Sequence, residues 1–371
     1  MDQLLFDIFQ AYYDARCNKR NTASQLEFEM NFEHELFQLH QELSTWTYKI
    51  WPSICFIISD PVKREVFASS FRDRVVHHLV YSYIYDFFDR HFIHDSYSCR
   101  IGKWTHYGIR RLNHFLRSCS QNYTRNCYIL KLDVQWFFMN IHKEILKQQI
   151  TEKLNTFEHI SLDKQWLLRL IYQIIDHDPT QNYVFKWNAS DYDWLPKEKS
   201  LFHAWVGKWL PIWNLTSQLF ANIYLDDFDK FMKYELWCRY YGRYVDDFFI
   251  IHQDKEFLKS LLHQIRQYLT DKLQLTLHPN KIYLQHYSKW VKFLGVYLKP
   301  WRTYIHRRTI GNFKKKMKNL VGGLDQKNEL NLINWYLGVL RHGRNFIIRK
   351  IILSTLSDFV FDAHFTCWKI K

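Results

Sequence analysis

Glycine is scarce in this chain of 371 residues, which holds only 10 of them. That is under 3% of the chain, whereas about 7% is usual in proteins. Tryptophan, ordinarily the rarest large side chain, occurs 15 times, and the two residues together number 25, close to an ordinary glycine content. The deficit of one residue and the excess of the other therefore suggest a common cause.

Paired cysteines, long apolar runs and a leader pattern are also missing. The seven cysteines are scattered, odd in number and form no C-x-x-C pair, which argues against a disulfide framework or a zinc module and favours a reducing compartment. No apolar run approaches membrane-spanning length, and the N-terminal residues Met1–Phe6 carry no basic region. We therefore expect a cytoplasmic protein that does not enter a membrane.

Basic residues outnumber acidic ones. Lysine and arginine number 51 against 37 aspartates and glutamates, a formal net charge of +14. With 47% hydrophobic and 18% aromatic residues the chain is typical of a globular protein, long enough for a large core or two to three subdomains. A polyanion is the natural partner of such a surface, and the alternative from charge alone is a merely soluble basic protein.

Helical and strand patterns both occur along the chain, which predicts an α+β fold. Apolar positions recur at helical spacing in residues 1–45, 63–92, 145–175, 215–234 and 256–273. Strand patterns occupy residues 128–133, 240–252, 275–277 and 291–298. Residues 176–199 are rich in turn formers, and residues 299–318 hold eight lysines or arginines and no acid, with helices expected from there to the end.

Two adjacent carboxylates, Asp246 and Asp247, stand at the tip of a predicted hairpin. Like charges side by side raise the free energy unless cations neutralise them. A third carboxylate, Asp133, ends the strand pattern of residues 128–133, although such a residue alone is more often a turn or helix cap. Three carboxylates from two strands can together hold two divalent ions for metal-assisted phosphoryl transfer.

Several sequence blocks accompany these acids in a fixed order. The blocks are Leu132-Asp-Val-Gln with Phe137-Phe138, Tyr244-Val-Asp-Asp247, Leu277-His-Pro-Asn-Lys281 and Phe293-Leu-Gly295. Together they resemble the catalytic palm of reverse transcriptases. Residues 64–78, 95–103 and 210–218 resemble the corresponding blocks of diversity-generating retroelement reverse transcriptases. The last of these blocks ends in Ser217-Gln218, where group II intron and retron relatives more often end in Ser-Pro.

The resemblance extends from about residue 10 to 350 and implies a right-hand polymerase fold. Fingers would occupy residues 1–125, a palm of antiparallel sheet and helices residues 126–300 with an insertion at 150–205, and a helical thumb residues 301–371. The implied activity is RNA-directed DNA polymerisation, copying a retroelement's template RNA into cDNA mutagenised at adenines. Template RNA, cDNA, dNTPs and a small basic accessory protein are the implied partners.

Matching positions imply roles around the metal ions. Asp133, Asp246 and Asp247 would ligate two Mg²⁺ ions, with Mn²⁺ as the alternative, and the Val134 backbone would line the site. Phe138 would be the aromatic gate that clashes with a ribose 2′-hydroxyl, whereas without the resemblance it is equally a core aromatic.

Other matching positions would surround the incoming nucleotide. Arg100 and Lys103 match cations of the finger loop that bind the triphosphate. Gln218 would lie beneath the nascent base pair and lower fidelity opposite adenine, and Lys281 would bind phosphate or protonate pyrophosphate. The basic residues 299–318 would begin the part of the thumb that follows the duplex backbone. For each cation the alternative is a solvated surface charge.

Two other functions are compatible with the same residues. One is a reverse transcriptase of the retron or group II intron kind, which Ser-Pro in place of Ser217-Gln218 would favour. The other is a catalytically silent RNA-binding protein on the same fold, which the intact aspartates argue against.

Tryptophan stands where the resembled family has glycine at several positions: Trp51, Trp104, Trp136, Trp194, Trp209, Trp213, Trp290 and Trp301. Glycine lets the backbone approach a nucleotide or adopt a positive φ, and an indole would block that space. Decay, adaptation of tryptophan for base stacking, and translation of UGA glycine codons as tryptophan are competing explanations. The translation of UGA glycine codons as tryptophan also accounts for the glycine deficit. Trp166 lies in a helical stretch and is interpreted as a true tryptophan.

Overall fold

The computed structural model describes residues 2–17, 22–58, 63–157, 163–186, 195–197, 200–212 and 214–320, together with Gly338. The chain forms two compact units, each discontinuous in sequence. The first comprises Met1–Ile101, Lys131–Phe249 and Lys259–Ile282, and the second Gly102–Leu130, Ile250–Leu258 and Tyr283–Lys371. Every helix within the described residues is too short or too polar to traverse a lipid bilayer.

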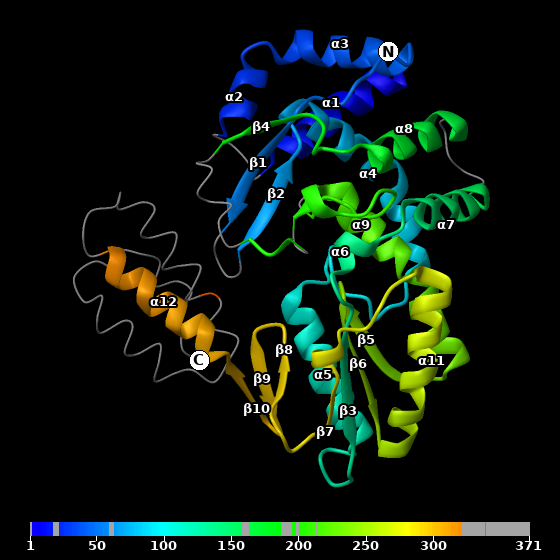
Figure 1. Ribbon diagram of the computed structural model, residues 1–371, viewed down its shortest axis with the longest axis vertical. Helices are drawn as coiled ribbons and strands as arrows, with labels where there is room; N and C mark the ends of the chain where they lie inside the picture. Colours follow the sequence, from blue (N-terminus) through cyan, green and yellow to red (C-terminus); the bar gives the residue numbers. More distant parts are fainter. Residues whose placement is uncertain are drawn as a thin grey trace. The chain divides into compact units, whose positions relative to one another are not determined.

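The N-terminal part of the first unit joins helices to a small sheet. Its elements are α1 (Gln3–Arg16), α2 (Ala23–Glu29), α3 (Phe32–Ser44), β1 (Ser53–Ile58), β2 (Arg64–Ala68) and α4 (Phe71–His91). Strand β1 pairs antiparallel with β2 and parallel with β4 (Tyr183–Phe185), giving the order β2-β1-β4 (Figure 1). Helix α4 packs against α1 and is buried along most of its length, because apolar residues surround it on several sides.

The remaining helices of the first unit follow β3 along the chain. They are α6 (Phe137–Asn140), α7 (Lys143–Asn155), α8 (Lys164–Asp176), η3 (Leu201–His203), α9 (Leu215–Tyr224), α10 (Asp226–Lys230), the π-helical turn η4 (Phe231–Glu235), α11 (Lys255–Leu273) and η5 (Pro279–Lys281). Helix α9 packs against α4 and α7. Helix α11 has its first residues in the second unit.

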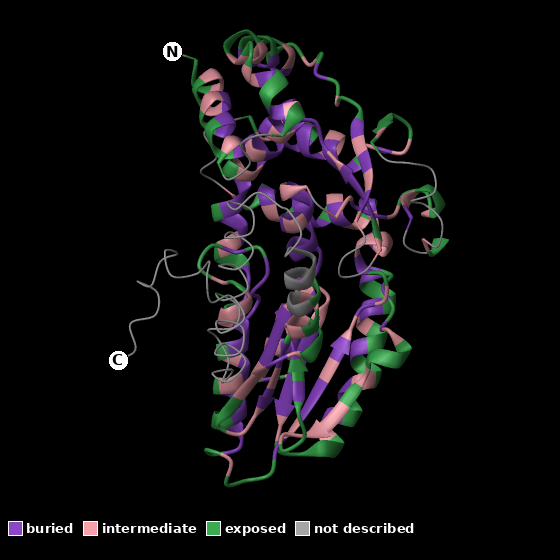
Figure 2. Ribbon diagram, turned by 90° about the vertical axis from the view of Figure 1, so that its left-hand side faces the viewer, coloured by how far each residue is buried: buried purple, intermediate pink, exposed green. Residues whose placement is uncertain are grey.

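A four-stranded sheet carries the acids. Its strands are β3 (Tyr128–Asp133), β5 (Tyr240–Tyr244), β6 (Asp247–His252) and β7 (Tyr283–His286), in the order β5-β6-β3-β7. Strands β3 and β6 contribute residues to both units. Four residues of β6 and three of β3 are buried and the others are half-buried, as expected for strands inside a sheet. Figure 2 shows buried residues in purple along the strands.

The second unit contains a helix, a three-stranded sheet and a basic helix. These are α5 (Thr105–Cys119), β8 (Val291–Phe293), β9 (Val296–Lys299), β10 (Arg302–Ile305) and α12 (Arg307–Leu320). Strand β9 pairs antiparallel with both β8 and β10. The predicted basic run of residues 299–318 therefore folds as the end of β9, strand β10 and most of α12.

The predicted helix over residues 63–92 is wrong at its beginning. Residues Arg64–Ala68 form β2, since Val66 and Phe67 are buried and the whole segment pairs with β1. Helix α4 starts at Phe71, where the Ser70 hydroxyl accepts a hydrogen bond from Asp73 N. This N-cap is the signal that separates the strand from the helix.

Two further predictions need correction. The single helix expected over residues 215–234 is divided into α9, α10 and the π-helical turn, with a break at Leu225. The strand expected at residues 275–277 is reduced to one isolated bridge between Leu277 and Val134. The predicted acidic hairpin is confirmed as β5 and β6. The helices expected beyond residue 320, and Trp194 and Trp213, lie outside the described residues.

Five tryptophans adopt a left-handed backbone. Of the ten tryptophans in the described part of the chain, these have φ between 47° and 84°: Trp46, Trp136, Trp209, Trp237 and Trp301. Only a few per cent of non-glycine residues have positive φ, because Cβ then crowds the backbone. Trp237 and Trp301 are also 81% and 59% exposed, so burial of the indole does not offset that strain.

This backbone geometry supports glycine as the native residue at these positions. Trp136, Trp209 and Trp301 were predicted from the sequence, whereas Trp46 and Trp237 were not. Trp51, Trp104 and Trp290 are exposed but do not have positive φ, so the backbone gives them no such support. Trp166 lies within α8, and its indole nitrogen donates to Leu43 O at 3.2 Å, as suits a true tryptophan.

Candidate active site

The three predicted acidic residues come together at the ends of two neighbouring strands. Asp133 is the last residue of β3, and Asp247 is the first of β6, directly after Asp246 in the hairpin turn. The turn is held against β3 because Val134 N donates to Asp246 O at 3.2 Å. All three carboxylates therefore belong to the first unit, although Asp133 is far from the other two in sequence.

The segment after α11 supports the other side of the β3 end. His278 N donates to Asp133 O at 2.8 Å, and Gln135 N donates to Thr276 O at 2.8 Å. These bonds place the turn η5 and its Lys281 beside Asp133. Val134, predicted to line the metal site through its backbone, is buried between the two supports.

Two lysines pair with the carboxylates. Lys281 Nζ lies 2.9 Å from Asp133 Oδ1, and Lys131 Nζ lies 2.9 Å from Asp247 Oδ2. The sequence interpretation missed Lys131, although its position two residues before Asp133 in a strand puts both side chains on one face. In this structure, lysines balance part of the negative charge of the site.

Two of these carboxyl groups, Asp246 and Asp247, have raised pKa values, mainly because they are buried. Burial raises the pKa of Asp246 to about 6, and the Asp133 charge adds to the shift. Burial also raises the pKa of Asp247 to about 6; the Lys131 ammonium opposes that shift and the Asp133 charge adds to it. Two carboxyl groups that ionise only near pH 6 lack part of the positive charge that would stabilise them as anions.

The donor chemistry of the site fits a hard divalent cation. Asp247 Oδ1 is buried and has no hydrogen-bond partner in the structure, and carboxylate oxygens are the ligands that Mg²⁺ prefers. As the side chains lie, no group of three or more His, Cys, Asp or Glu residues among the described ones is already arranged to hold a metal. An ion bound by Asp133, Asp246 and Asp247 would therefore take over the charge balance that Lys281 and Lys131 now provide.

The raised pKa values predict that the metal-free protein becomes less stable as the pH rises. Stabilisation from protonated Asp246 and Asp247 is complete below their ordinary pKa near 4 and is lost as the pH rises through about 6. The difference between the folded and the ordinary pKa corresponds to roughly 3 kcal/mol for each carboxyl group. We expect unfolding in EDTA to show this loss between about pH 4 and pH 7, and the double variant Asp246→Asn, Asp247→Asn to lack it. Equal pH dependence of the two proteins would contradict the assignment.

Phe138 lies close in sequence to the acids, on the short helix α6. Its ring is half-buried and packs edge-on against Phe137 at 5.4 Å between ring centroids. Its carbonyl accepts from Leu210 N at 2.8 Å, which fixes the helix to the segment before α9. Trp136, 45% exposed and left-handed, caps the N-terminus of this helix. Trp136 thus lies two residues before the predicted nucleotide gate, Phe138.

Arg100 is placed differently from the expectation of a finger-loop cation. Its side chain is buried, with Nε 2.6 Å from Asp89 Oδ1. Nη1 donates to Ile93 O and Ser96 O, and Nη2 donates to Asp89 O. Since these bonds occupy the guanidinium inside the protein, we leave Arg100 out of the proposed triphosphate ligands.

The remaining predicted cation, Lys103, belongs to the second unit. It follows Gly102 in a turn before α5 and is half-buried. Its role in triphosphate binding stays a prediction.

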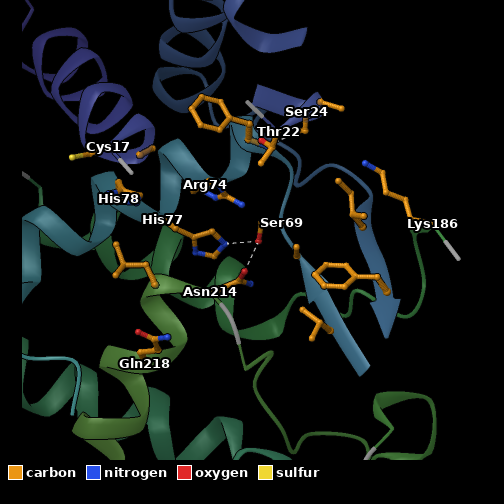
Figure 3. A pocket seen from close by; sticks show the side chains of 18 of the residues that line it. Cys17, Thr22, Ser24, Ser69, Arg74, His77, His78, Lys186, Asn214 and Gln218 are labelled. Atoms are coloured by element: carbon orange, nitrogen blue, oxygen red, sulfur yellow. Dashed lines mark hydrogen bonds between the residues drawn. The ribbon is translucent and has the colours of Figure 1, made fainter. Parts of the chain in front are cut away.

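Gln218 lines a cavity of about 640 Å³ in the first unit (Figure 3). Among the residues that the structure describes, those in the wall include no acid, and one of them is Arg74, whose Nη1 is buried without a hydrogen-bond partner. His77 is fixed in the wall between Ser69 Oγ at 3.0 Å and Thr216 Oγ1 at 2.8 Å. Burial lowers the pKa of His77 to about 3, so this imidazole is neutral and Arg74 supplies positive charge.

Comparison with known proteins finds neither a family nor a curated relative: no protein-family model and no curated protein sequence matches the chain. Solved structures of telomerases are among those to which the chain is similar. An apo telomerase from Candida tropicalis, truncated from its C-terminal domain, gives a TM-score of 0.48 at 12% identity over 69% of this chain and 55% of its own.

Two other telomerase structures are similar to the same extent. A telomerase from Candida albicans in complex with a fragment of telomeric RNA gives 0.46 at 12% identity, over 88% and 59% of the two chains. Another apo telomerase from Candida tropicalis gives 0.45 at 12% identity, over 68% and 48%. This chain spans about half the length of those telomerases. Similarity this weak identifies no family, so we infer the function from the side chains of the site.

Proposed function

We propose that the chain is an RNA-directed DNA polymerase that copies a retroelement template RNA into cDNA. The observation that supports it is the meeting of Asp133, Asp246 and Asp247 on two adjacent strands, with Asp247 Oδ1 buried and unbonded. Within the proposed right-hand fold, these acids belong to the palm at residues 126–300, between fingers and a thumb from residue 301. The net charge of +14 suits a nucleic acid partner.

In this proposal the three aspartates hold two Mg²⁺ ions, which Mn²⁺ can replace. The bound ions supply charge neutralisation at the attacking 3′-hydroxyl and at the leaving pyrophosphate. Asp133 and Asp247 would bind these ions in place of their lysine partners, and Lys281, 47% exposed, would then be available to bind or protonate pyrophosphate. Gln218 contacts the nascent base pair and lowers fidelity opposite template adenine.

Primer extension on an RNA template tests the proposal. The protein is prepared with glycine at the left-handed tryptophan positions and at Trp104 and Trp213, and receives dNTPs with Mg²⁺ or with EDTA. We expect extension only with Mg²⁺, and errors concentrated opposite adenine. Absence of Mg²⁺-dependent extension by this folded protein would end the enzyme proposal and leave an RNA-binding protein.

Phe138 provides a test of the nucleotide gate. Replacing Phe138 with alanine removes the ring that we propose clashes with a ribose 2′-hydroxyl. We expect incorporation of ribonucleotides relative to deoxyribonucleotides to rise about 10- to 100-fold, with dNTP incorporation reduced much less. Phe137→Leu, a change in the buried partner ring, serves as the control. Unchanged sugar discrimination in Phe138→Ala would remove Phe138 from the site.

A further inference from the structure

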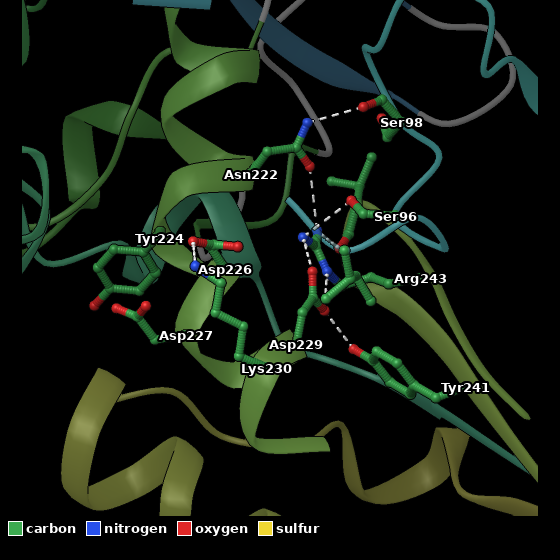
Figure 4. A network of polar contacts seen from close by, with 12 residues as sticks. Ser96, Ser98, Asn222, Tyr224, Asp226, Asp227, Asp229, Lys230, Tyr241 and Arg243 are labelled. Carbon is green, nitrogen blue, oxygen red and sulfur yellow. Dashed lines mark hydrogen bonds and ion pairs between the residues drawn. The ribbon is translucent and has the colours of Figure 1, made fainter. Parts of the chain in front are cut away.

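A fully buried arginine precedes the acidic turn. Arg243, the residue before Tyr244 at the end of β5, pairs with Asp229 of α10, and both side chains are 0% exposed. Nε lies 2.8 Å from Asp229 Oδ1 and Nη2 lies 2.6 Å from Asp229 Oδ2, a two-pronged contact (Figure 4). Tyr241 donates its hydroxyl to Asp229 Oδ1 at 2.5 Å and holds that carboxylate in place.

The same guanidinium reaches the turn itself. Nη1 donates to Val245 O at 3.0 Å, and Val245 is the residue directly before Asp246. Val245 has φ of 56°, a left-handed conformation that a β-branched side chain strongly disfavours. Such strained residues persist where the surrounding structure holds them, and they cluster at functional sites.

Further bonds tie Arg243 to separate parts of the first unit. Its Nη1 donates to Asn222 Oδ1 of α9 at 3.3 Å, and its Nη2 donates to Ser96 Oγ at 3.3 Å. Its backbone pairs with the segment around Ser96, since Arg243 N donates to Asp95 O and Tyr97 N donates to Arg243 O. Asn222 in turn donates to Ser98 O at 2.8 Å. The arginine is therefore immobilised from several directions, and the Val245 carbonyl shares its rigidity.

Stability alone does not account for this arrangement. Removing an arginine and a carboxylate from water is expensive, and apolar residues of similar volume often stabilise a core as well or better. The bond from Nη1 to Val245 O adds a geometric effect that an apolar pair cannot reproduce, because only a donor at that point can fix the carbonyl of the strained residue.

We propose that Arg243, held by Asp229, is a positioning residue that fixes the Val245 turn and thereby the orientation of Asp246 and Asp247. This inference rests on the proposed polymerase function. Arg243 touches neither substrate nor metal, and its effect is exerted through the turn. Outer partners of metal ligands typically change metal affinity or activity by about 10- to 100-fold when they are replaced.

Arg243→Lys tests the proposal, because lysine keeps the charge and loses the fork that reaches both Asp229 and Val245. The matched control is Arg72→Lys. Arg72 is another buried arginine, and it pairs with Glu42 rather than with a residue of the acidic turn. We expect both variants to unfold at lower temperature. Only Arg243→Lys should raise the Mg²⁺ concentration for half-maximal extension, by about tenfold or more, and weaken Mn²⁺ binding measured by electron paramagnetic resonance without substrate.

A milder variant keeps the test decisive where Arg243→Lys does not fold. Tyr241→Phe removes one bond to Asp229 and no charge, and we expect it to raise the Mg²⁺ requirement by about two- to fivefold. If the folded variants match Arg72→Lys in Mg²⁺ requirement and Mn²⁺ affinity, Arg243 is structural and the proposal is overturned. If the unaltered protein binds Mn²⁺ but extends no primer, the polymerase function fails, while a loss of Mn²⁺ affinity confined to the Arg243 and Tyr241 variants still supports positioning.

Discussion

Asp246→Asn abolishes Mg²⁺-dependent primer extension while making the metal-free protein more stable at pH 8. The activity falls at least about 10³-fold, over 4 kcal/mol of barrier, because a metal ligand is lost. The free energy of unfolding rises by about 1–3 kcal/mol, since the pKa of about 6 shows that the Asp246 anion is destabilised by burial and by Asp133. Steady-state extension and thermal unfolding in EDTA measure the two effects.

The opposite signs of these effects distinguish a functional acid from a structural one. If Asp246 served only as a turn cap, its replacement would destabilise the protein and leave extension intact. Asp271→Asn, on the exposed face of α11, is the matched control and should change neither quantity. An Asp246→Asn protein that unfolds more easily, or that still extends primers, would contradict the account of the site.

Restoring glycine at three exposed left-handed tryptophans stabilises the protein and increases its activity. The positions are Trp136, Trp237 and Trp301, with φ of 47°, 51° and 62°. Each replacement removes a strain of about 1 kcal/mol or more, so the triple variant should gain about 3 kcal/mol. Trp136→Gly should also raise extension on the order of tenfold, because it clears an exposed indole beside the Phe138 helix.

Trp166→Gly is the control for this prediction. Its backbone is helical, its indole donates to Leu43 O, and its ring lies 5.8 Å from that of Trp46. Glycine there should destabilise the protein by more than 1 kcal/mol through lost packing and helix propensity. Equal destabilisation by all four replacements would show that the tryptophans belong to the native chain. The gene decides independently: UGG codons at Trp136, Trp209 and Trp301 would exclude recoded UGA.

The acidic hairpin and its third carboxylate could be predicted from sequence because their signals are local. An aspartate pair interrupts the strand residues that end in Ile251, and Asp133 ends an apolar strand. Strand alternation would also have disclosed Lys131, two residues before Asp133. The Lys281–Asp133 ion pair joins residues 148 positions apart, so only the fold brings it into view.

Other features depend on packing that no local pattern records. The sequence around each arginine gives no hint that Arg100 is buried against Asp89, or that Arg243 pairs with Asp229. Residues Arg64–Ala68 fit a helical pattern, and pairing with β1 makes them a strand. The tryptophan excess suggested glycine positions, while the φ angles, which follow from the whole fold, added Trp46 and Trp237 to them.

Counting bound Mn²⁺ tests the central claim most directly. Electron paramagnetic resonance would measure Mn²⁺ bound to the protein with a chain-terminated primer on an RNA template and the next dNTP. The account predicts two ions per protein at pH 8, weaker binding below pH 6 as Asp246 and Asp247 become protonated, and loss of binding in Asp246→Asn. Equal Mn²⁺ binding by the unaltered protein and Asp246→Asn would show that these aspartates do not form a metal centre.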